Sequence, residues 1–259
     1  GDFMSREKIV VLDFGSQYAH LIAKRFRMLG FYSEIALPSA GLEVFENAKG
    51  IVFSGGPASV YDEKVPDFNS EILNLDIPIL GLCYGHYIVQ IGYNGKVGKA
   101  PVGEFGFATL NLNSSVECPL FKGIDFSNGQ QVWMSHQDGV LKMGDGFETV
   151  GSTKDCPYAA TQNLSKKRFS LQFHCEVNDT PCGNQIFKNF ADFCGIKTNW
   201  DQDTVLLTII ENIKKDAHKE DGDKNVLLFL SGGVDSTVAF ALLNKALGQE
   251  RVLGLHIDN

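Results

Sequence analysis

The chain has 259 residues, of which 44% are hydrophobic and 21% are charged, as in a globular protein of one or two domains. Its formal net charge of -8 argues against broad binding to nucleic acid or anionic membranes, and no apolar run approaches the roughly 20 residues of a membrane span. The six cysteines show neither a zinc-binding spacing nor a compact disulfide framework, so we expect no metal ligands and a reducing, cytoplasmic compartment.

The N-terminal half alternates short apolar runs with helical segments. The predicted strands are residues 9–12, 31–37, 50–53 and 77–82. Helical periodicity runs from Tyr18 to Leu29 and ends at Gly30, a residue type that often caps a helix C-terminus. This alternation predicts an α/β fold with a mostly parallel sheet flanked by helices. Functional residues of such sheets gather beyond the carboxyl ends of the strands.

The rest of the chain divides into a β-rich middle and a second α/β segment. In the middle we expect an Asn-Gly turn at 94–95, a closing helix at 185–193, and strands at 105–112, 131–134, 147–153 and 168–173. Beyond it we expect a helix at 203–213, a charged linker at 214–224, a strand at 226–230, a further helix and a strand at 251–257. The predicted domains are therefore 1–198, a helix and linker at 199–225, and the truncated start of a second α/β domain at 226–259.

Cys83 follows an apolar run and stands between Gly81 and Gly85. The spacing matches G-x-S-x-G, the nucleophile elbow in which a strand turns sharply into a helix, with sulfur in place of the serine oxygen. A thiol at a helix N-terminus is favoured as thiolate by the free N–H groups and the helix dipole. The alternative is a buried structural cysteine, which is the commoner role of a single Cys.

A thiol nucleophile needs a base, and the base needs an orienting acceptor. His174 ends a predicted strand and Glu176 follows two residues later, so both side chains point the same way in extended chain. The backbone N–H groups of Gly56 and Tyr84 are candidates for an oxyanion hole. A chance surface His-x-Glu pair and a simple glycine turn are the alternatives. His136 follows a predicted strand, where it could contact substrate.

A second motif joins a predicted strand to a helix, with successive backbone N–H groups suited to pyrophosphate. It comprises Ser231, Gly232, Gly233, Val234, Asp235, Ser236 and Thr237. The motif lacks the Lys of a Walker A loop, and Asp235 would repel phosphate unless it bound magnesium or capped the helix. A plain helix cap is the alternative.

Together these motifs resemble the class I, triad-type glutamine amidotransferases, and specifically the GMP synthetase family. The segments that carry the resemblance are 12–18, 54–57, 81–85, 133–136, 174–176, 230–237 and 256–259. The resemblance implies a flavodoxin-like amidotransferase domain followed by the start of an N-type ATP pyrophosphatase domain. It implies that XMP, ATP, glutamine and water give GMP, AMP, pyrophosphate and glutamate, with Mg²⁺ on the ATP and no cofactor for the glutaminase half. It also implies a homodimer formed through a C-terminal part that this chain does not include.

The resemblance assigns a role to each candidate residue. The nucleophile is Cys83, the proton relay is His174 and its orienting carboxylate is Glu176, while Gly56 and Tyr84 stabilise the oxyanion. The implied glutamine contacts are Tyr87, Ser135, His136 and Asp138, and the implied ATP-binding residues are 231–237.

Two positions depart from the family pattern. Tyr87 stands where relatives usually have a Gln that holds the substrate, and Cys175 stands where they usually have Pro. Two other functions therefore stay open. A γ-glutamyl hydrolase or cysteine peptidase on the same fold would leave residues 231–237 unexplained, and a glutamine-sensing module would be consistent with Tyr87.

Overall fold

The computed structural model describes residues 6–15, 17–201, 226–231 and 252–257. The chain divides into two compact units, Gly1–Asn199 and Trp200–Asn259. In the second unit β10 (Val226–Ser231) pairs in parallel with β11 (Val252–Ile257), as the apolar runs predicted. The predicted helix at 203–213, the linker at 214–224, the helix that follows residue 233 and the loop residues 232–237 lie outside the described residues.

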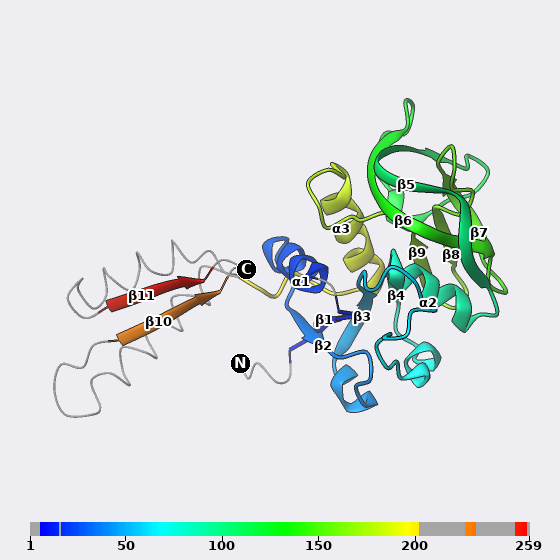
Figure 1. The fold of residues 1–259 in the computed structure, drawn as a ribbon. Helices are drawn as coiled ribbons and strands as arrows, with labels where there is room; N and C mark the ends of the chain where they lie inside the picture. The colour runs from blue at the N-terminus through cyan, green and yellow to red at the C-terminus, as the bar shows by residue number, and fades with distance from the viewer. Residues whose placement is uncertain (1–5, 16, 202–225, 232–251, 258–259) are drawn as a thin grey trace. The chain divides into compact units, whose positions relative to one another are not determined.

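The first unit is built on a nine-stranded sheet with the order β2-β1-β3-β4-β9-β8-β7-β5-β6 (Figure 1). Its strands are β1 (Lys8–Leu12), β2 (Ser33–Ala36), β3 (Ala48–Phe53), β4 (Ile79–Leu82), β5 (Lys96–Leu112), β6 (Gln130–Lys142), β7 (Glu148–Ser152), β8 (Ala160–Asn163) and β9 (Arg168–Leu171). The strands from β2 to β9 in this order are parallel, and the rest pair antiparallel. This arrangement confirms the predicted α/β fold, and the sheet is mixed, with four parallel and four antiparallel strand pairings.

Helices cover both faces of the parallel part. The α-helices of this unit are α1 (Tyr18–Met28), α2 (Tyr84–Gly92) and α3 (Gly183–Cys194), and short 3-10 turns are η2 (Leu42–Phe45), η3 (Ser70–Asn74) and η4 (Pro119–Phe121). The predicted helices before Gly30 and after residue 182 are confirmed. Between β2 and β3, and between β3 and β4, the described connections hold 3-10 turns in place of longer helices.

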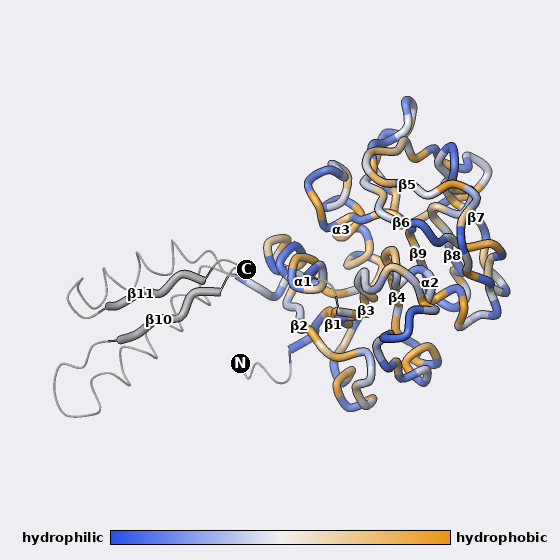
Figure 2. Tube along the Cα trace, in the orientation of Figure 1, coloured by the Kyte–Doolittle hydropathy of each residue, from blue (hydrophilic) through white to orange (hydrophobic). Residues whose placement is uncertain are grey.

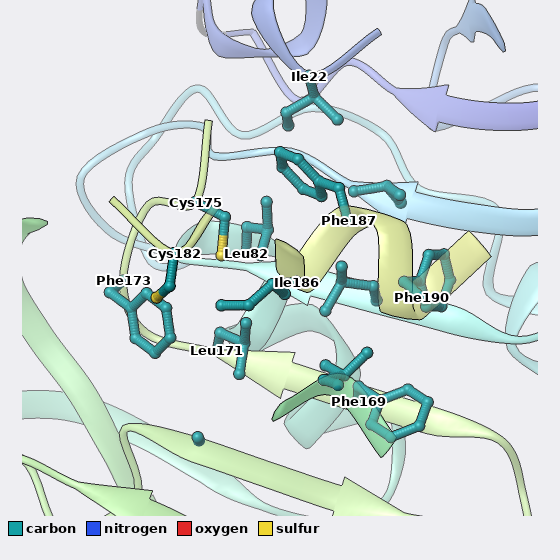
Figure 3. Close-up of a cluster of buried hydrophobic side chains, with 14 of the residues drawn as sticks. Ile22, Leu82, Phe169, Leu171, Phe173, Cys175, Cys182, Ile186, Phe187 and Phe190 are labelled. Carbon is teal, nitrogen blue, oxygen red and sulfur yellow. The ribbon is translucent and has the colours of Figure 1, made fainter. Parts of the chain in front are cut away.

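Successive residues of the central strands pack into two different hydrophobic cores, one on each face of the sheet. Ile9 and Val11 of β1 pack with α1 and α3, whereas Val10 and Leu12 pack on the side of α2. This division follows from the period of two of a strand buried on both faces. Hydrophobic residues accordingly follow the central strands in Figure 2, and Figure 3 shows side chains of α1, β4, β9 and α3 meeting in the first core.

Three strands differ from the prediction, and one of them, β5, begins at Lys96 and not at residue 105. β8 was not predicted, because its sequence Ala-Thr-Gln-Asn has no apolar run, although all four residues are buried. Thr161 Oγ1 lies 2.7 Å from Ser170 Oγ, and Gln162 Nε2 donates to the Glu117 carbonyl at 2.9 Å, so tertiary hydrogen bonds satisfy the Thr161 hydroxyl and the Gln162 amide nitrogen. β6 is longer than predicted, so His136 lies within a strand and does not follow one.

Among the described residues, no helix has both the length and the apolar character that crossing a membrane requires.

Candidate active site

Cys83 lies at a strained turn between β4 and α2. Its backbone has φ +53° and ψ −106°, a combination that non-glycine residues rarely adopt. Neither glycine position that flanks Cys83 has room for a side chain. A Cβ on Gly81 would lie 2.4 Å from the Gly85 carbonyl oxygen. A Cβ on Gly85 would lie 2.4 Å from the Phe53 carbonyl oxygen. The two glycines therefore permit the elbow that the sequence predicted at this cysteine.

Backbone hydrogen bonds fasten the elbow to its neighbours. The Cys83 N–H donates to the Leu171 carbonyl at 2.8 Å, which joins the turn to β9. The Gly85 N–H donates to the Ser54 carbonyl at 3.1 Å, and the Ser54 hydroxyl accepts from the Phe14 N–H at 3.1 Å. The carboxyl ends of β1, β3, β4 and β9 thus meet around the sulfur, as expected for parallel strands.

His174 follows β9, and its imidazole is buried beside a buried carboxylate. His174 Nδ1 lies 2.6 Å from Glu176 Oε1, and the two residues are 3% and 0% exposed. The neighbouring backbone is held by Trp133, whose carbonyl accepts from the His174 N–H at 3.1 Å. Arg25 on α1 donates to the Glu176 carbonyl at 3.2 Å. These contacts fix the orientation of the imidazole and leave its Nε2 for Cys83.

Burial and charge act in opposite directions on His174. Burial alone lowers the pKa of the imidazole, but hydrogen bonds with Cys83 and Glu176, together with their negative charge, raise the pKa well above its usual value. The imidazole is therefore held in its charged form at neutral pH. A cation beside a sulfur atom at a helix N-terminus favours the thiolate.

A cavity of about 260 Å³ opens at Cys83. It is lined by residues from six separate segments of the first unit: Tyr18, Gly56, Pro57, Ala58, Cys83, Tyr87, Phe105, Ser135, His136, Gln137 and His174. Glu176 lies behind His174 and does not line it. A Cβ on Gly56 would lie 3.0 Å from Tyr84 Cγ, so the two residues proposed for an oxyanion hole are neighbours.

The four residues that the resemblance implies as glutamine contacts differ in how they face the cavity at Cys83. The carbonyl oxygen of Ser135 lies 3.8 Å from Cys83 Sγ. Tyr87 lines the cavity with only 1% of its surface exposed, and its hydroxyl donates to the Asp138 carbonyl at 2.7 Å. Both ring nitrogens of His136 already have hydrogen-bond partners within the protein. The Asp138 side chain is not among the lining groups.

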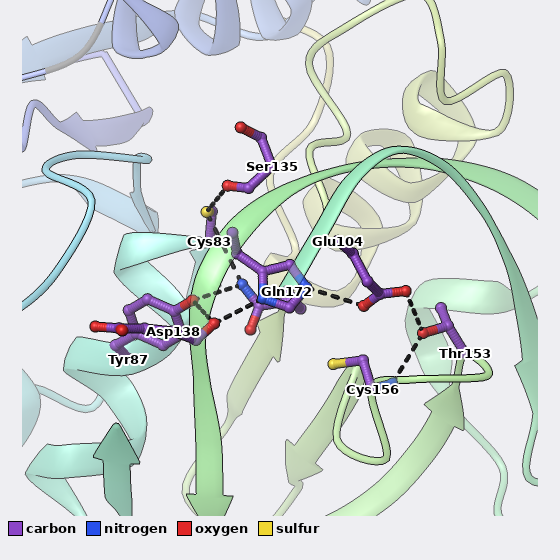
Figure 4. A network of polar contacts seen from close by, with 9 residues as sticks. Cys83, Tyr87, Glu104, Ser135, Asp138, Thr153, Cys156 and Gln172 are labelled. Atoms are coloured by element: carbon purple, nitrogen blue, oxygen red, sulfur yellow. Dashed lines mark hydrogen bonds and ion pairs between the residues drawn. The ribbon is translucent and has the colours of Figure 1, made fainter. Parts of the chain in front are cut away.

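Three neighbours of the site were not predicted as functional. Gln172 Nε2 lies 3.9 Å from Cys83 Sγ and 2.9 Å from Tyr87 Oη (Figure 4). Glu104 Oε1 on β5 lies 2.9 Å from His136 Nε2, and the ring of Tyr18 lies 4.7 Å from that of His174. Gln172 could have been found from its position two residues before His174. Glu104 carries no comparable local signal, because it comes from a distant segment, and Tyr18 belongs to segment 12–18, which carries the family resemblance but no assigned role.

One group of side chains in the described part of the chain offers three atoms of the kind that bind metals. Glu104, His136 and Cys156 place their ligand atoms within 4.8 Å of one another. His136 Nδ1, however, lies 2.6 Å from the Asp138 carbonyl, and Thr153 donates to Glu104 Oε2 at 2.9 Å. The protein's own hydrogen bonds therefore already use the His and Glu groups.

Comparison with known proteins identifies the family. Residues 10–193 match the family described as glutamine amidotransferase class-I, which is more than half of the chain. The chain belongs to the class-I glutamine amidotransferase family. Residues 205–259 match the family described as NAD synthase. The amidotransferase match spans the cavity, the elbow and the His-Glu pair.

Curated relatives extend over nearly the whole chain. A probable glutamine-hydrolysing GMP synthase of Leptospira interrogans is 43% identical over 97% of this chain and 41% of its own length. A glutamine-hydrolysing GMP synthase of Lactobacillus acidophilus is 44% identical over 98% of this chain and 48% of its own length. The chain thus spans less than half the length of these relatives.

Solved structures share the fold of the first unit. A Thermoplasma acidophilum protein described as a GMP synthase subunit is 27% identical, has a TM-score of 0.64, and covers 73% of this chain and 94% of its own. A glutamine amidotransferase of Thermotoga maritima is 16% identical with a TM-score of 0.51, covering 92% of this chain and 90% of its own, which supports the fold alone.

Proposed function

We propose that the first unit hydrolyses glutamine to glutamate and ammonia through Cys83, His174 and Glu176. The observation that carries this proposal is the strained cysteine at the end of β4, opposite a buried imidazole that a carboxylate orients at 2.6 Å. Nucleophile, base and orienting acceptor stand in the relation that covalent acyl transfer requires.

The reaction starts from the thiolate and imidazolium pair. Cys83 Sγ attacks the side-chain carbonyl carbon of glutamine, and the carbonyl electrons move onto oxygen. As the tetrahedral intermediate collapses, the C–N bond breaks, and ammonia leaves with the proton from His174. A thioester remains on Cys83. His174, now neutral, takes a proton from water, whose oxygen displaces the thiolate to give glutamate.

The N–H groups of Gly56 and Tyr84 are proposed to stabilise the oxyanion in both steps. Support comes from the closeness of the two residues and from the position of Tyr84 as the first residue of α2. Ser135 and Tyr87 are proposed to contact the substrate because both line the cavity. Glu176 keeps the imidazole in one orientation and stabilises its positive charge.

We further propose that the ammonia is used to make GMP from XMP and ATP, in a protein whose synthetase half extends beyond this chain. Glutamine-hydrolysing GMP synthases that are 42% to 44% identical support this extension. We propose domain limits of 1–198, 199–225 and 226–259. Residues 231–237 would bind the ATP phosphates, which carry Mg²⁺ when bound. Of these, only Ser231 lies within the described part, at the end of β10.

Ammonia release from glutamine tests the glutaminase assignment. The wild type is expected to release ammonia and to be labelled at Cys83 by a glutamine-derived affinity reagent. Cys83→Ala is expected to lose both. Cys194→Ala, a change at a cysteine on the far end of α3, is the matched control and should keep both. Labelling at another cysteine would contradict the assignment.

The same assays separate the alternatives. Turnover of γ-glutamyl peptides in preference to glutamine would favour a hydrolase or peptidase. Calorimetric binding of glutamine without ammonia release, with the remaining synthetase part supplied, would favour a sensing module.

A further inference from the structure

We propose that Gln172 is an additional active-site residue, which donates a hydrogen bond to the Cys83 sulfur and is locked in that orientation by Tyr87. The inference deepens the proposed glutaminase function and depends on it for the role of Cys83 as nucleophile. None of the steps proposed for glutamine hydrolysis uses the Gln172 amide.

The position of Gln172 is set by the strand that presents the base. It lies immediately after β9, two residues before His174, and both side chains approach the Cys83 sulfur. Gln172 is fully buried, and its N–H donates to the Ala159 carbonyl at 2.8 Å. Burial and this backbone hydrogen bond therefore fix the position of the Gln172 side chain next to the Cys83 sulfur.

The contacts of Tyr87 determine which end of the Gln172 amide faces the sulfur. A phenol has one proton, and that of Tyr87 is donated to the Asp138 carbonyl at 2.7 Å. The Tyr87 oxygen must then accept from Gln172, whose Nε2 lies 2.9 Å away (Figure 4). The same nitrogen lies 3.9 Å from Cys83 Sγ. An amide nitrogen carries two protons, so one is available for the phenol and the other for the sulfur.

The opposite orientation is disfavoured by the hydrogen bond that the Tyr87 hydroxyl donates to the Asp138 carbonyl. If the amide were reversed, its carbonyl oxygen would face both the thiolate and a phenol oxygen whose proton is already used. In the observed orientation, Gln172 Oε1 is buried and has no hydrogen-bond partner among the described residues. A buried acceptor without a partner is destabilising, and the two hydrogen bonds at the nitrogen of the amide offset that cost.

A donor at this place favours the reactive form of the cysteine. The Ser135 carbonyl, 3.8 Å from Cys83 Sγ, can accept only from the protonated thiol. Gln172 donates, so it favours the thiolate through a charge-assisted hydrogen bond. Together with the His174 imidazolium it provides a second stabilising group for the sulfur anion.

The experiment measures the rate of Cys83 alkylation by iodoacetamide between pH 5 and 9, with mass spectrometry of the Cys83 peptide, on the 259-residue chain. Gln172→Met keeps the volume and removes the donor. We expect it to raise the pH midpoint of alkylation by about one unit, and to slow alkylation about tenfold at pH values well below that midpoint. The control is Gln90→Met, another fully buried Gln, whose amide donates to Thr161 and Ser170 instead. It should lose stability but keep the wild-type midpoint.

A second variant tests the hydrogen bond by which Tyr87 orients the Gln172 amide. Tyr87→Phe keeps the ring and removes the oxygen, so the Gln172 amide is free to rotate. We expect a smaller shift of the midpoint in the same direction, and no further shift when Tyr87→Phe is added to Gln172→Met. The proposal would be overturned if Gln172→Met and Tyr87→Phe both kept the wild-type pH midpoint of Cys83 alkylation. If Gln172→Met does not fold, the midpoint of Tyr87→Phe decides. Alkylation needs no glutamine, so a wild type inactive on glutamine would contradict only the proposed function.

Discussion

Two buried histidines of this protein differ in charge, because only one of them lies beside negatively charged groups that outweigh the effect of burial. His174 faces a carboxylate and a sulfur, which raise its pKa. His86 on α2 is buried with Nδ1 2.6 Å from the Ser170 hydroxyl, and burial lowers its pKa from 6.5 to about 3. Burial therefore keeps the imidazole of His86 neutral in the folded protein at neutral and mildly acidic pH.

This contrast gives a prediction for the pH dependence of stability. Below pH 6.5 the unfolded chain binds a proton at His86 that the folded chain does not, so the free energy of unfolding falls as the pH falls. Between pH 7 and 5 the wild type should lose about 2 kcal/mol more than His86→Leu. Urea unfolding at both pH values measures the difference. His174 acts in the opposite sense, because its stabilisation is present below pH 6.5 and is lost only as the pH rises through its raised pKa.

The control for this prediction is His20→Gln, since His20 is exposed on α1. It should keep the wild-type change between pH 7 and 5. An equal change in wild type and His86→Leu would show that His86 can be protonated in the folded state.

At the scale of one element, the turn from β4 into α2 depends on close approach of the backbone. A Cβ on Gly85 would lie 2.4 Å from a carbonyl oxygen of β3, and backbone cannot move aside as a flexible side chain does. Gly85→Ala should lower the free energy of unfolding by about 3 kcal/mol and displace the sulfur, so that ammonia release is lost in the protein that still folds. Denaturant unfolding and the ammonia assay measure the two effects.

Gly139→Ala on β6 is the matched control, because its Cβ would meet only the Ala100 methyl at 3.3 Å. It should change stability by less than about 1 kcal/mol. Equal effects of the two substitutions would mean that the elbow has room for a side chain.

At the scale of the whole molecule, hydrogen bonds join the last residue of the first unit, Asn199, to residues near its N-terminus. The Asn199 side chain accepts from the Tyr32 N–H at 2.9 Å and donates to the Glu7 carbonyl at 2.6 Å. Its own N–H donates to the Gly30 carbonyl at 2.9 Å. Asn199→Ala should therefore destabilise the first unit by about 1–3 kcal/mol, as measured by urea unfolding. Asn184→Ala, at an exposed position of α3, should have little effect.

A second prediction at this scale concerns the product. The 259-residue polypeptide spans 41% to 48% of the length of its GMP synthase relatives from Leptospira and Lactobacillus. It should release ammonia from glutamine but form no GMP from XMP and ATP, because most of the synthetase half of those relatives has no counterpart in it. Chromatography of the nucleotides after incubation tests this. GMP formed by this polypeptide alone would contradict the proposed division of labour.

Sequence reasoning succeeded where the information is local. The apolar runs that end at residues 12, 53 and 82 predicted parallel strands, and all three strands lie in the sheet. The glycines around Cys83 indicated a tight turn, and the i, i+2 spacing of His174 and Glu176 indicated a shared direction. These signals depend on backbone sterics and on the period of a strand, both of which act over a few residues.

Sequence reasoning failed where groups distant in the chain satisfy one another. The polar strand β8 is buried because its side chains form hydrogen bonds with other strands and loops. Its sequence therefore shows no hydrophobic pattern that would predict a strand. Glu104 reaches His136 across the β5–β6 pair, and the proton of Tyr87 goes to the Asp138 carbonyl.

By itself, therefore, the amino-acid sequence determined the order of the parallel strands along the chain, the sharp turn at Cys83 and the pairing of His174 with Glu176. Only the tertiary structure decided that these groups share one cavity, that His86 stays neutral, and that the donor end of Gln172 faces the sulfur. The reason is physical: torsional preferences are set by neighbouring residues, whereas burial and the direction of a hydrogen bond depend on every segment that packs around a group.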